Sequence, residues 1–161
     1  MKTTELYEEG HEYVDLGLSV KWATCNMGAE SPDGYGYRYE RVNIKWGGRW
    51  RIPSVEDFKE LIENCSFEWQ EQDDVRGLLF VSLKPGFEGS SIFLRASGLY
   101  DIDEVGPYEY GLYWTANHSS ADTSLPHSAR ILFFEKGLSG KGEVSIVPHS
   151  RNLWANIRPV F

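Results

Sequence analysis

Between residues 11 and 26, apolar side chains occupy alternate positions, and this pattern limits the fold more than any other feature of the chain. The apolar positions are Val14, Leu16, Leu18, Val20 and Trp22. A period of two places these side chains on one face of an extended strand. Gly17 interrupts the run at a position where the strand can divide in two or form a bulge. The pattern therefore predicts β-structure near the start of the chain.

One later segment has helical spacing instead. Ser54 suits an N-cap, and Asp57 follows three residues later, close to a capping box. The acidic residues in the first turn also favour the helix dipole. Apolar residues then recur on one helical face at Val55, Phe58, Leu61, Ile62 and Cys65. We predict a helix over about 55–65.

After this helix the sequence returns to short runs of strand-forming residues. They cover 78–83, 91–96, 110–116, 129–134, 143–147 and 154–160, and Gly, Pro, Asn or Asp separates most of them. The strands do not alternate with helices, so the pattern is α+β, with long loops. Residues 1–10 are polar and predict a flexible tail. Residues 11–161 have the length of a single domain, with no linker or internal repeat.

The composition agrees with a strand-and-turn domain. Aromatic residues make up 14% of the 161 residues, and there are 16 glycines. Aromatic side chains favour strands and glycines favour turns. The composition excludes intrinsic disorder, collagen and coiled coil.

The net charge of −8 argues against nucleic acid as a partner, because phosphate binding depends on Lys and Arg. Residues 56–74 hold eight acids and one lysine, so they supply −7 of this total. We interpret them as a solvated helix face that runs into an exposed loop. A smaller basic cluster alternates with Trp46 and Trp50, and we interpret it as a turn and a packing corner. Its members are Arg38, Arg41, Lys45, Arg49 and Arg51.

Two cysteines and the absence of long apolar runs bear on the cellular compartment. Cys25 and Cys65 form a candidate disulfide if the chain enters an oxidising compartment, and two buried thiols are the alternative. Their spacing fits no zinc or redox motif. No apolar run reaches the 18 or so residues of a transmembrane helix, and no secretory leader is visible at the start. The chain is thus expected to be cytoplasmic, or to have lost a leader.

The common catalytic motifs are missing. No Gly-x-Ser-x-Gly elbow, phosphate-binding loop or His-Glu-x-x-His pair occurs, and the four histidines are far apart. Residues 101–106 resemble the start of an EF-hand loop, but Val105 and Leu112 stand where oxygen ligands are needed. A looser calcium loop is the alternative. We predict no catalytic residue, no metal and no cofactor; two or more histidines that converge with an acid in one pocket would contradict this prediction.

Aromatic, amide and basic side chains gather towards the C-terminus. Trp, Tyr and Arg are frequent anchors of binding surfaces. The candidate ligand-binding residues are Tyr113, Asn117, His118, His149, Arg151, Asn152 and Trp154. The alternative is that the tryptophans, Trp114 and Trp154, belong to the core.

Five blocks of the chain, in order, carry a family resemblance. Residues 13–29, 50–65, 91–98, 111–115 and 157–160 resemble the Fibrobacter succinogenes major paralogous domain, which is found in surface proteins of gut Bacteroidetes. This resemblance implies a C-type-lectin-like fold of the branch shared with formylglycine-generating enzymes. Its sheets are twisted and mostly antiparallel. The two ends of the chain are expected to pair, residues 12–25 with residues 154–160.

The chain also departs from relatives with that fold. No cysteine follows Cys65, so the chemistry of the enzyme relatives does not carry over, and the calcium-binding tripeptides of sugar-binding lectins are absent. The resemblance therefore implies a non-enzymatic ligand-binding or adhesion domain of a bacterial surface protein. We expect a monomer, extracellular or at the cell surface, that binds a protein or glycan through its C-terminal loops. A structural module of a larger surface assembly and an enzyme with a spatially assembled site are the alternatives.

Overall fold

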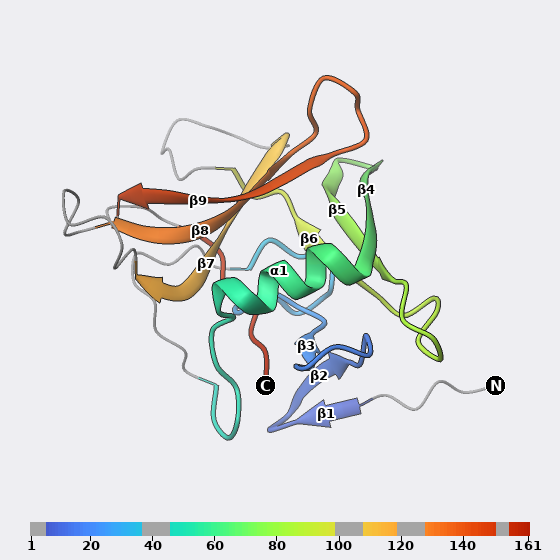
Figure 1. Ribbon diagram of the computed structural model, residues 1–161, viewed down its shortest axis with the longest axis vertical. Coiled ribbons are helices and arrows are strands. Elements are labelled where there is room, and N and C mark those ends of the chain that lie inside the picture. The colour runs from blue at the N-terminus through green and yellow to red at the C-terminus, as the bar shows by residue number, and fades with distance from the viewer. Residues whose placement is uncertain (1–5, 37–45, 99–107, 119–127, 151–154) are drawn as a thin grey trace.

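The computed structural model describes residues 6–36, 46–98, 108–118, 128–150 and 155–161. At residues 117, 118, 128, 129 and 150 it describes the backbone alone. The elements, in chain order, are β1 (Leu6–Glu8), β2 (His11–Val14), β3 (Trp22–Ala23), α1 (Val55–Asn64), β4 (Cys65–Gln72), β5 (Val75–Ser82), β6 (Ser91–Arg95), β7 (Tyr110–His118), β8 (Ser128–Glu135) and β9 (Glu143–Ser150). The described strands form three antiparallel sheets of three strands, β1-β2-β3, β4-β5-β6 and β7-β8-β9 (Figure 1). This arrangement confirms the α+β prediction.

The alternating segment near the start divides into two strands, as we predicted from Gly17. Strand β2 ends at Val14 and β3 begins at Trp22. Gly17 between them has a φ of 76°, and the ring of Phe87 lies where a side chain at this position would point. The apolar residues Leu16, Leu18, Val20 and Trp22 are all buried. The period of two therefore identified four buried side chains, while Val14, the fifth predicted position, is half-buried and the strand itself is interrupted.

The polar start of the chain is partly ordered, contrary to the prediction of a tail over residues 1–10. Leu6–Glu8 forms strand β1, in which Leu6 pairs with Tyr13 and Glu8 with His11. The Trp50 indole Nε1 donates a hydrogen bond to the Glu8 carbonyl at 2.8 Å. Backbone pairing and a distant tryptophan order this strand, and neither interaction can be recognised from the sequence of residues 6–8. Residues 1–5 lie outside the described residues.

The predicted helix is confirmed as Val55–Asn64, together with its capping box. The Ser54 hydroxyl accepts a hydrogen bond from the Asp57 N–H at 3.1 Å, and the Asp57 carboxylate accepts one from the Ser54 N–H at 2.8 Å. Arg51 pairs with Asp57 at 2.7 Å. Burial raises the pKa of Asp57, but the bonds from Arg51 and Ser54 outweigh it, and the pKa lies below its ordinary value. The cap thus joins the helix to the preceding loop.

The interpretation of residues 56–74 was correct for Glu56 and Glu63 of the helix, and wrong for buried Asp57 and for the residues after the helix. Glu56 and Glu63 are exposed on α1, but Cys65–Gln72 is strand β4 rather than a loop. It pairs with β5 along its whole length, and Asp73 and Asp74 form the turn with positive φ. Cys65, Phe67 and Trp69 alternate with exposed polar residues, which is the pattern of a strand with one solvent-exposed face.

Helix α1 packs against strands of both larger sheets, β4, β5, β7 and β8. Phe58 and Leu61 of the helix, both fully buried, join a core cluster with Trp22, Phe80 and Phe134. A second cluster forms around Trp114, which is 1% exposed. Of the two alternatives for Trp114, the structure therefore supports the core.

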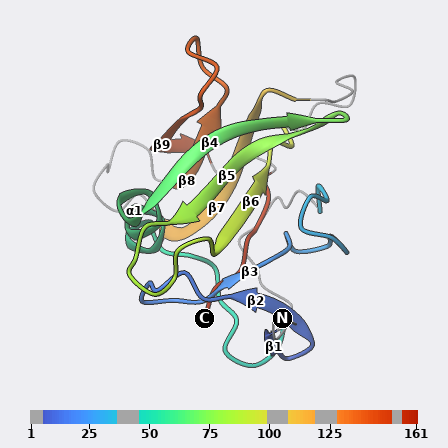
Figure 2. The same ribbon diagram turned by 90° about the vertical axis from the view of Figure 1, so that its right-hand side faces the viewer.

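The C-terminal segment 155–161 runs through the middle of the fold and joins its two ends. Val160 pairs with both Trp22 and Arg51, and Asn156 pairs with Tyr113. In both views the C-terminus lies beside β2 and β3 (Figures 1 and 2). The expected pairing of the two chain ends is therefore present. It consists of isolated bridges, so the described part of 154–160 is an extended segment and not a full strand.

A buried arginine, Arg158, anchors this segment. Its side chain is 0% exposed, and it donates hydrogen bonds to three neutral oxygens. Nε contacts Asn26 Oδ1 at 2.8 Å, Nη1 contacts the Ala23 carbonyl at 3.2 Å, and Nη2 contacts the Phe93 carbonyl at 2.6 Å. Burial lowers the pKa of Arg158 from its ordinary value. The guanidinium thus connects the N-terminal segment, β6 and the C-terminal segment.

We expect Arg158→Met to destabilise the protein by about 3 kcal/mol, because three buried acceptors lose their donor. Arg158→Lys keeps a charge but loses the planar fork, so it should also destabilise the fold. Urea unfolding measures both changes, and Lys59→Met on the exposed face of α1 is the control that should change little. A loss below about 1 kcal/mol for Arg158→Met would contradict the anchoring role.

Candidate functional site

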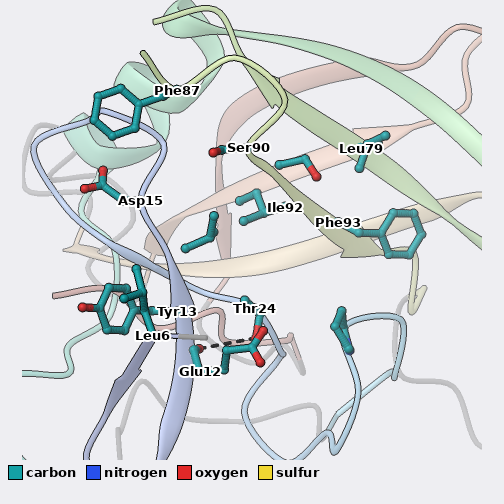
Figure 3. Close-up of a pocket in the computed structure, with 13 residues that line it drawn as sticks. Leu6, Glu12, Tyr13, Asp15, Thr24, Leu79, Phe87, Ser90, Ile92 and Phe93 are labelled. Carbon is teal, nitrogen blue, oxygen red and sulfur yellow. Dashed lines mark hydrogen bonds between the residues drawn. The ribbon is translucent and has the colours of Figure 1, made fainter. Parts of the chain in front are cut away.

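A cleft of about 600 Å³ lies between β2 and β6 (Figure 3). Segments from five parts of the chain line it: Leu6, residues 12–15, Thr24 with Pro32, Leu79, and Phe87 with residues 90–93. Figure 3 shows Tyr13 and Glu12 on the β2 side, with Ile92 and Phe93 on the β6 side. The cleft is therefore a product of tertiary structure, because no single segment contains more than one of its walls.

Cross-strand pairs supply the apolar surface of both walls. Leu6 pairs with Tyr13 across β1 and β2, and Leu79 pairs with Phe93 across β5 and β6. Directly paired residues of antiparallel strands place their side chains on the same face of the sheet. The two pairs thus form two apolar surfaces, and each is carried by regular secondary structure.

The polar groups of the cleft are carboxylates and hydroxyls. Asp15 accepts a hydrogen bond from the Gly17 N–H at 2.9 Å and pairs with Lys21 at 3.2 Å. The Thr24 hydroxyl donates to the Glu12 carbonyl at 3.4 Å. Ser90 and Ser91 complete the set, and the described lining contains no His, Cys or Lys beside these hydroxyls. Such groups can donate hydrogen bonds to a ligand and accept them from it.

Two smaller hollows adjoin the cleft. One, of about 300 Å³, shares Glu12, Thr24 and Pro32 with the cleft and continues towards Trp46 and Glu30. The other, of about 580 Å³, shares Leu79 and Phe93 and continues towards the β4–β5 turn. Because neighbouring hollows have lining residues in common, the concave surface extends from the cleft into both hollows. We refer to the three together as the groove.

The basic and aromatic cluster next to the groove is a packing corner, as predicted. His11 stacks on Trp46 at 3.6 Å between ring centroids, and Trp46 meets Trp50 edge-on at 5.1 Å. Arg49 lies 4.4 Å above the Phe161 ring. Burial lowers the pKa of His11. Among the other predicted members of the cluster, Arg38, Arg41 and Lys45 lie outside the described residues.

Of the predicted ligand-binding residues whose side chains the structure describes, Tyr113 lies in the core. It is 0% exposed, accepts a hydrogen bond from Asn26 Nδ2 at 2.8 Å and donates to the Arg95 carbonyl at 3.1 Å. Burial raises its pKa, and nearby Arg158 only partly offsets this effect. The expectation of a ligand contact is therefore corrected. The hydroxyl joins two parts of the buried network instead.

The other predicted residues divide into two groups. Asn117 and His118 end β7, where His118 pairs with Ala129 of β8, and Ala129 pairs with His149 of β9. The backbone thus brings His118 and His149 to the same end of one sheet. Arg151, Asn152 and Trp154 lie outside the described residues. His11 is in a different sheet, and the described residues contain no group of three His, Cys, Asp or Glu suited to a metal ion.

Both cysteines are free in the structure. Cys25 is half-buried and lines the smaller hollow beside Trp46, whereas Cys65 is buried at the start of β4. Burial, assisted by the negative charge of Glu60, raises the pKa of Cys65 to about 11. The structure therefore contains two thiols and not the candidate disulfide.

None of the family models, curated proteins or solved structures compared with this chain matches it. The resemblance stated above stays a prediction, and the α+β arrangement is what the structure shows. In the parts of the chain that the structure describes, no helix is both long and apolar enough to cross a membrane.

Sequence reasoning missed the cleft residues. Glu12, Thr24, Ser91 and Phe93 lie in ordinary strand and turn sequences, and their spacing carries no motif. One available signal was the position of Phe93 within a short strand, where it alternates with buried Ile92 and Leu94. That signal marks a side chain on the opposite face of the strand, but it does not reveal what faces it.

We predict that Cys65 is unreactive towards iodoacetamide at pH 8 in the folded protein. Its pKa of about 11 keeps it protonated, and burial blocks access. Mass spectrometry should find at most one alkylated thiol in the native protein and two after denaturation. If no thiol reacts after denaturation without reductant, the free state of the cysteines is contradicted.

We expect Tyr113→Phe to destabilise the fold by about 1–3 kcal/mol, because Asn26 and the Arg95 carbonyl each lose a buried partner. Urea unfolding measures the change. Tyr7→Phe, on the exposed strand β1, is the matched control and should change stability far less. A Tyr113→Phe protein as stable as the wild type would return Tyr113 to the candidate binding residues.

Proposed function

We propose that this chain is a non-enzymatic ligand-binding domain, and that its ligand occupies the cleft between β2 and β6. The observation that carries the proposal is how the cleft is held open. A single buried guanidinium, Arg158, bonds the Phe93 carbonyl on one wall and the Ala23 carbonyl next to Thr24 on the other. The spacing of the walls is set before a ligand arrives, and preorganisation lowers the entropic cost of binding.

The lining supports binding rather than catalysis. Aromatic and aliphatic walls with a few oxygen groups are typical of sites that hold and orient a ligand. Ser90 and Ser91 have no histidine or lysine beside them in the described lining, and Asp15 already neutralises Lys21. The polar groups of the cleft can therefore donate and accept hydrogen bonds, while no nucleophile of this lining is paired with a base.

The cellular location and the ligand class of this binding domain are proposed from the family resemblance. The resemblance supports a bacterial surface protein with an adhesive role, whose ligand is a protein or glycan. The end of the β7-β8-β9 sheet, where His118 and His149 flank Ala129, is the alternative binding surface. The cleft is favoured because Arg158 joins its two walls to each other.

The test is binding of the fluorescently labelled protein to glycan and protein arrays, followed by titration of the strongest hit. We expect Phe93→Ala to weaken that hit at least tenfold, about 1.4 kcal/mol, because an aromatic wall of the cleft is lost. Leu138→Ala is the matched control, since Leu138 is fully exposed on the loop between β8 and β9 and does not line the cleft.

Thermal unfolding of both variants shows whether the fold is kept. If the hit binds Phe93→Ala as tightly as the wild type and no longer binds His149→Ala, the binding site is at the end of the β7-β8-β9 sheet and not in the cleft. An absence of hits on every array would contradict the proposed function itself.

A further inference from the structure

The groove is long enough for an extended chain. Residues 12–14 of β2 line the cleft on one side, and Ser90 with the first three residues of β6 lines it on the other. At about 3.3 Å per residue, four extended residues span roughly 13 Å. The two adjoining hollows continue from the cleft towards Trp46 and towards Asp73, and the neighbouring residues Pro32 and Asp33 line one each. A small ligand would fill one hollow, whereas an extended segment of four or more residues occupies the cleft and reaches an adjoining hollow.

The charged side chains that line the groove are all acidic, while two buried guanidiniums behind its walls, Arg95 and Arg158, bond the carbonyls of Asp33 and Phe93. Five carboxylates line its hollows: Glu12, Asp15, Glu30, Asp33 and Asp73. The described lining residues include no Lys or Arg, and the ion pair of Lys21 with Asp15 neutralises a single member. A concave surface with charges of one sign focuses the field and attracts the opposite charge.

The surface between the carboxylates is apolar and aromatic. Leu6 and Tyr13 line one wall, Leu79 and Phe93 line the other, and Trp46 lines the smaller hollow. Lys and Arg side chains combine an apolar stem with a cationic head, so they can pack along such walls and reach the acids. Cations also gain from the faces of Tyr and Trp rings. A neutral glycan gains nothing from this field, and nucleic acid would be repelled.

Resting on the proposed function, we infer that the ligand of this domain is an extended polypeptide segment rich in Lys or Arg, bound along the groove. Its alternate side chains lie on the apolar walls and its cationic heads meet the carboxylates. Glu12 is central to this arrangement because it lines both the cleft and the smaller hollow. Glu30 supplies the next carboxylate on the side of Trp46.

The experiment is selection from a displayed library of random octapeptides on the full chain, followed by titration of the enriched peptides. We expect an excess of Lys and Arg among them, and affinities that fall as salt is raised. The double variant E12Q/E30Q should weaken them at least tenfold. The matched control E56Q/E63Q also changes the net charge from −8 to −6, but on the exposed face of α1, and should stay within about twofold.

The outcomes separate this inference from the proposed function. Suppose that Phe93→Ala abolishes the binding of the enriched peptides. If these peptides carry no excess of Lys or Arg, or if they bind E12Q/E30Q as tightly as the wild type, the inference is overturned and the cleft stays the binding site. A glycan that binds the wild type and not Phe93→Ala would do the same. Equal losses in E12Q/E30Q and E56Q/E63Q would show a general charge effect and overturn the groove as the site. An absence of any ligand, peptide or glycan, would overturn the proposed function as well.

Discussion

The buried guanidinium of Arg158 is the interaction on which the rest of this structure depends. An arginine is charged at any physiological pH, and removing its charge from water is costly unless every donor finds an acceptor. Here the acceptors are the Asn26 amide and the carbonyls of Ala23 and Phe93, which belong to two distant parts of the chain. Folding must bring these parts together around the C-terminal segment before the cost is offset. The network therefore favours one arrangement of the two chain ends and β6, because its hydrogen bonds are directional and apolar contacts are not.

The same network explains why the cleft is where it is. Side chains satisfy carbonyls on the outer edge of β6: the Phe93 carbonyl accepts from Arg158, and the Arg95 carbonyl accepts from the Tyr113 hydroxyl. These side chains occupy the place that another strand would take, and β6 stops being a free edge. Because Arg158 bonds both the Phe93 carbonyl of β6 and the Ala23 carbonyl of β3, it sets the distance between the two walls of the cleft. Stability and the candidate site therefore share their residues, and the groove carboxylates lie outside the buried network.

Particular elements show how far the sequence could be interpreted. The helix was predicted with its cap because Ser54, Asp57 and the apolar face are local signals. Strand β4, which has one solvent-exposed face, was misread as a loop because its charged residues obscured the alternation of Cys65, Phe67 and Trp69. Tyr113 was misread as a surface residue because aromatic and polar neighbours occur both in binding sites and in buried networks. Only burial and hydrogen-bond partners distinguish the two, and these depend on residues far away in the chain.

By itself, the sequence determined the class of the fold, the helix, the buried positions of the first alternating segment and the strong negative charge. Periodicity, capping and composition are properties of neighbouring residues, so they can be recognised without knowing where the chain goes. Only the tertiary structure decided that residues 155–161 run through the centre, that Arg158 is buried, and that Glu12 faces the same groove as Phe93. These features join residues up to 135 positions apart, as in the bond between Arg158 and Ala23. No local pattern encodes such a contact, because its free energy depends on how both partners are desolvated and positioned by the rest of the fold.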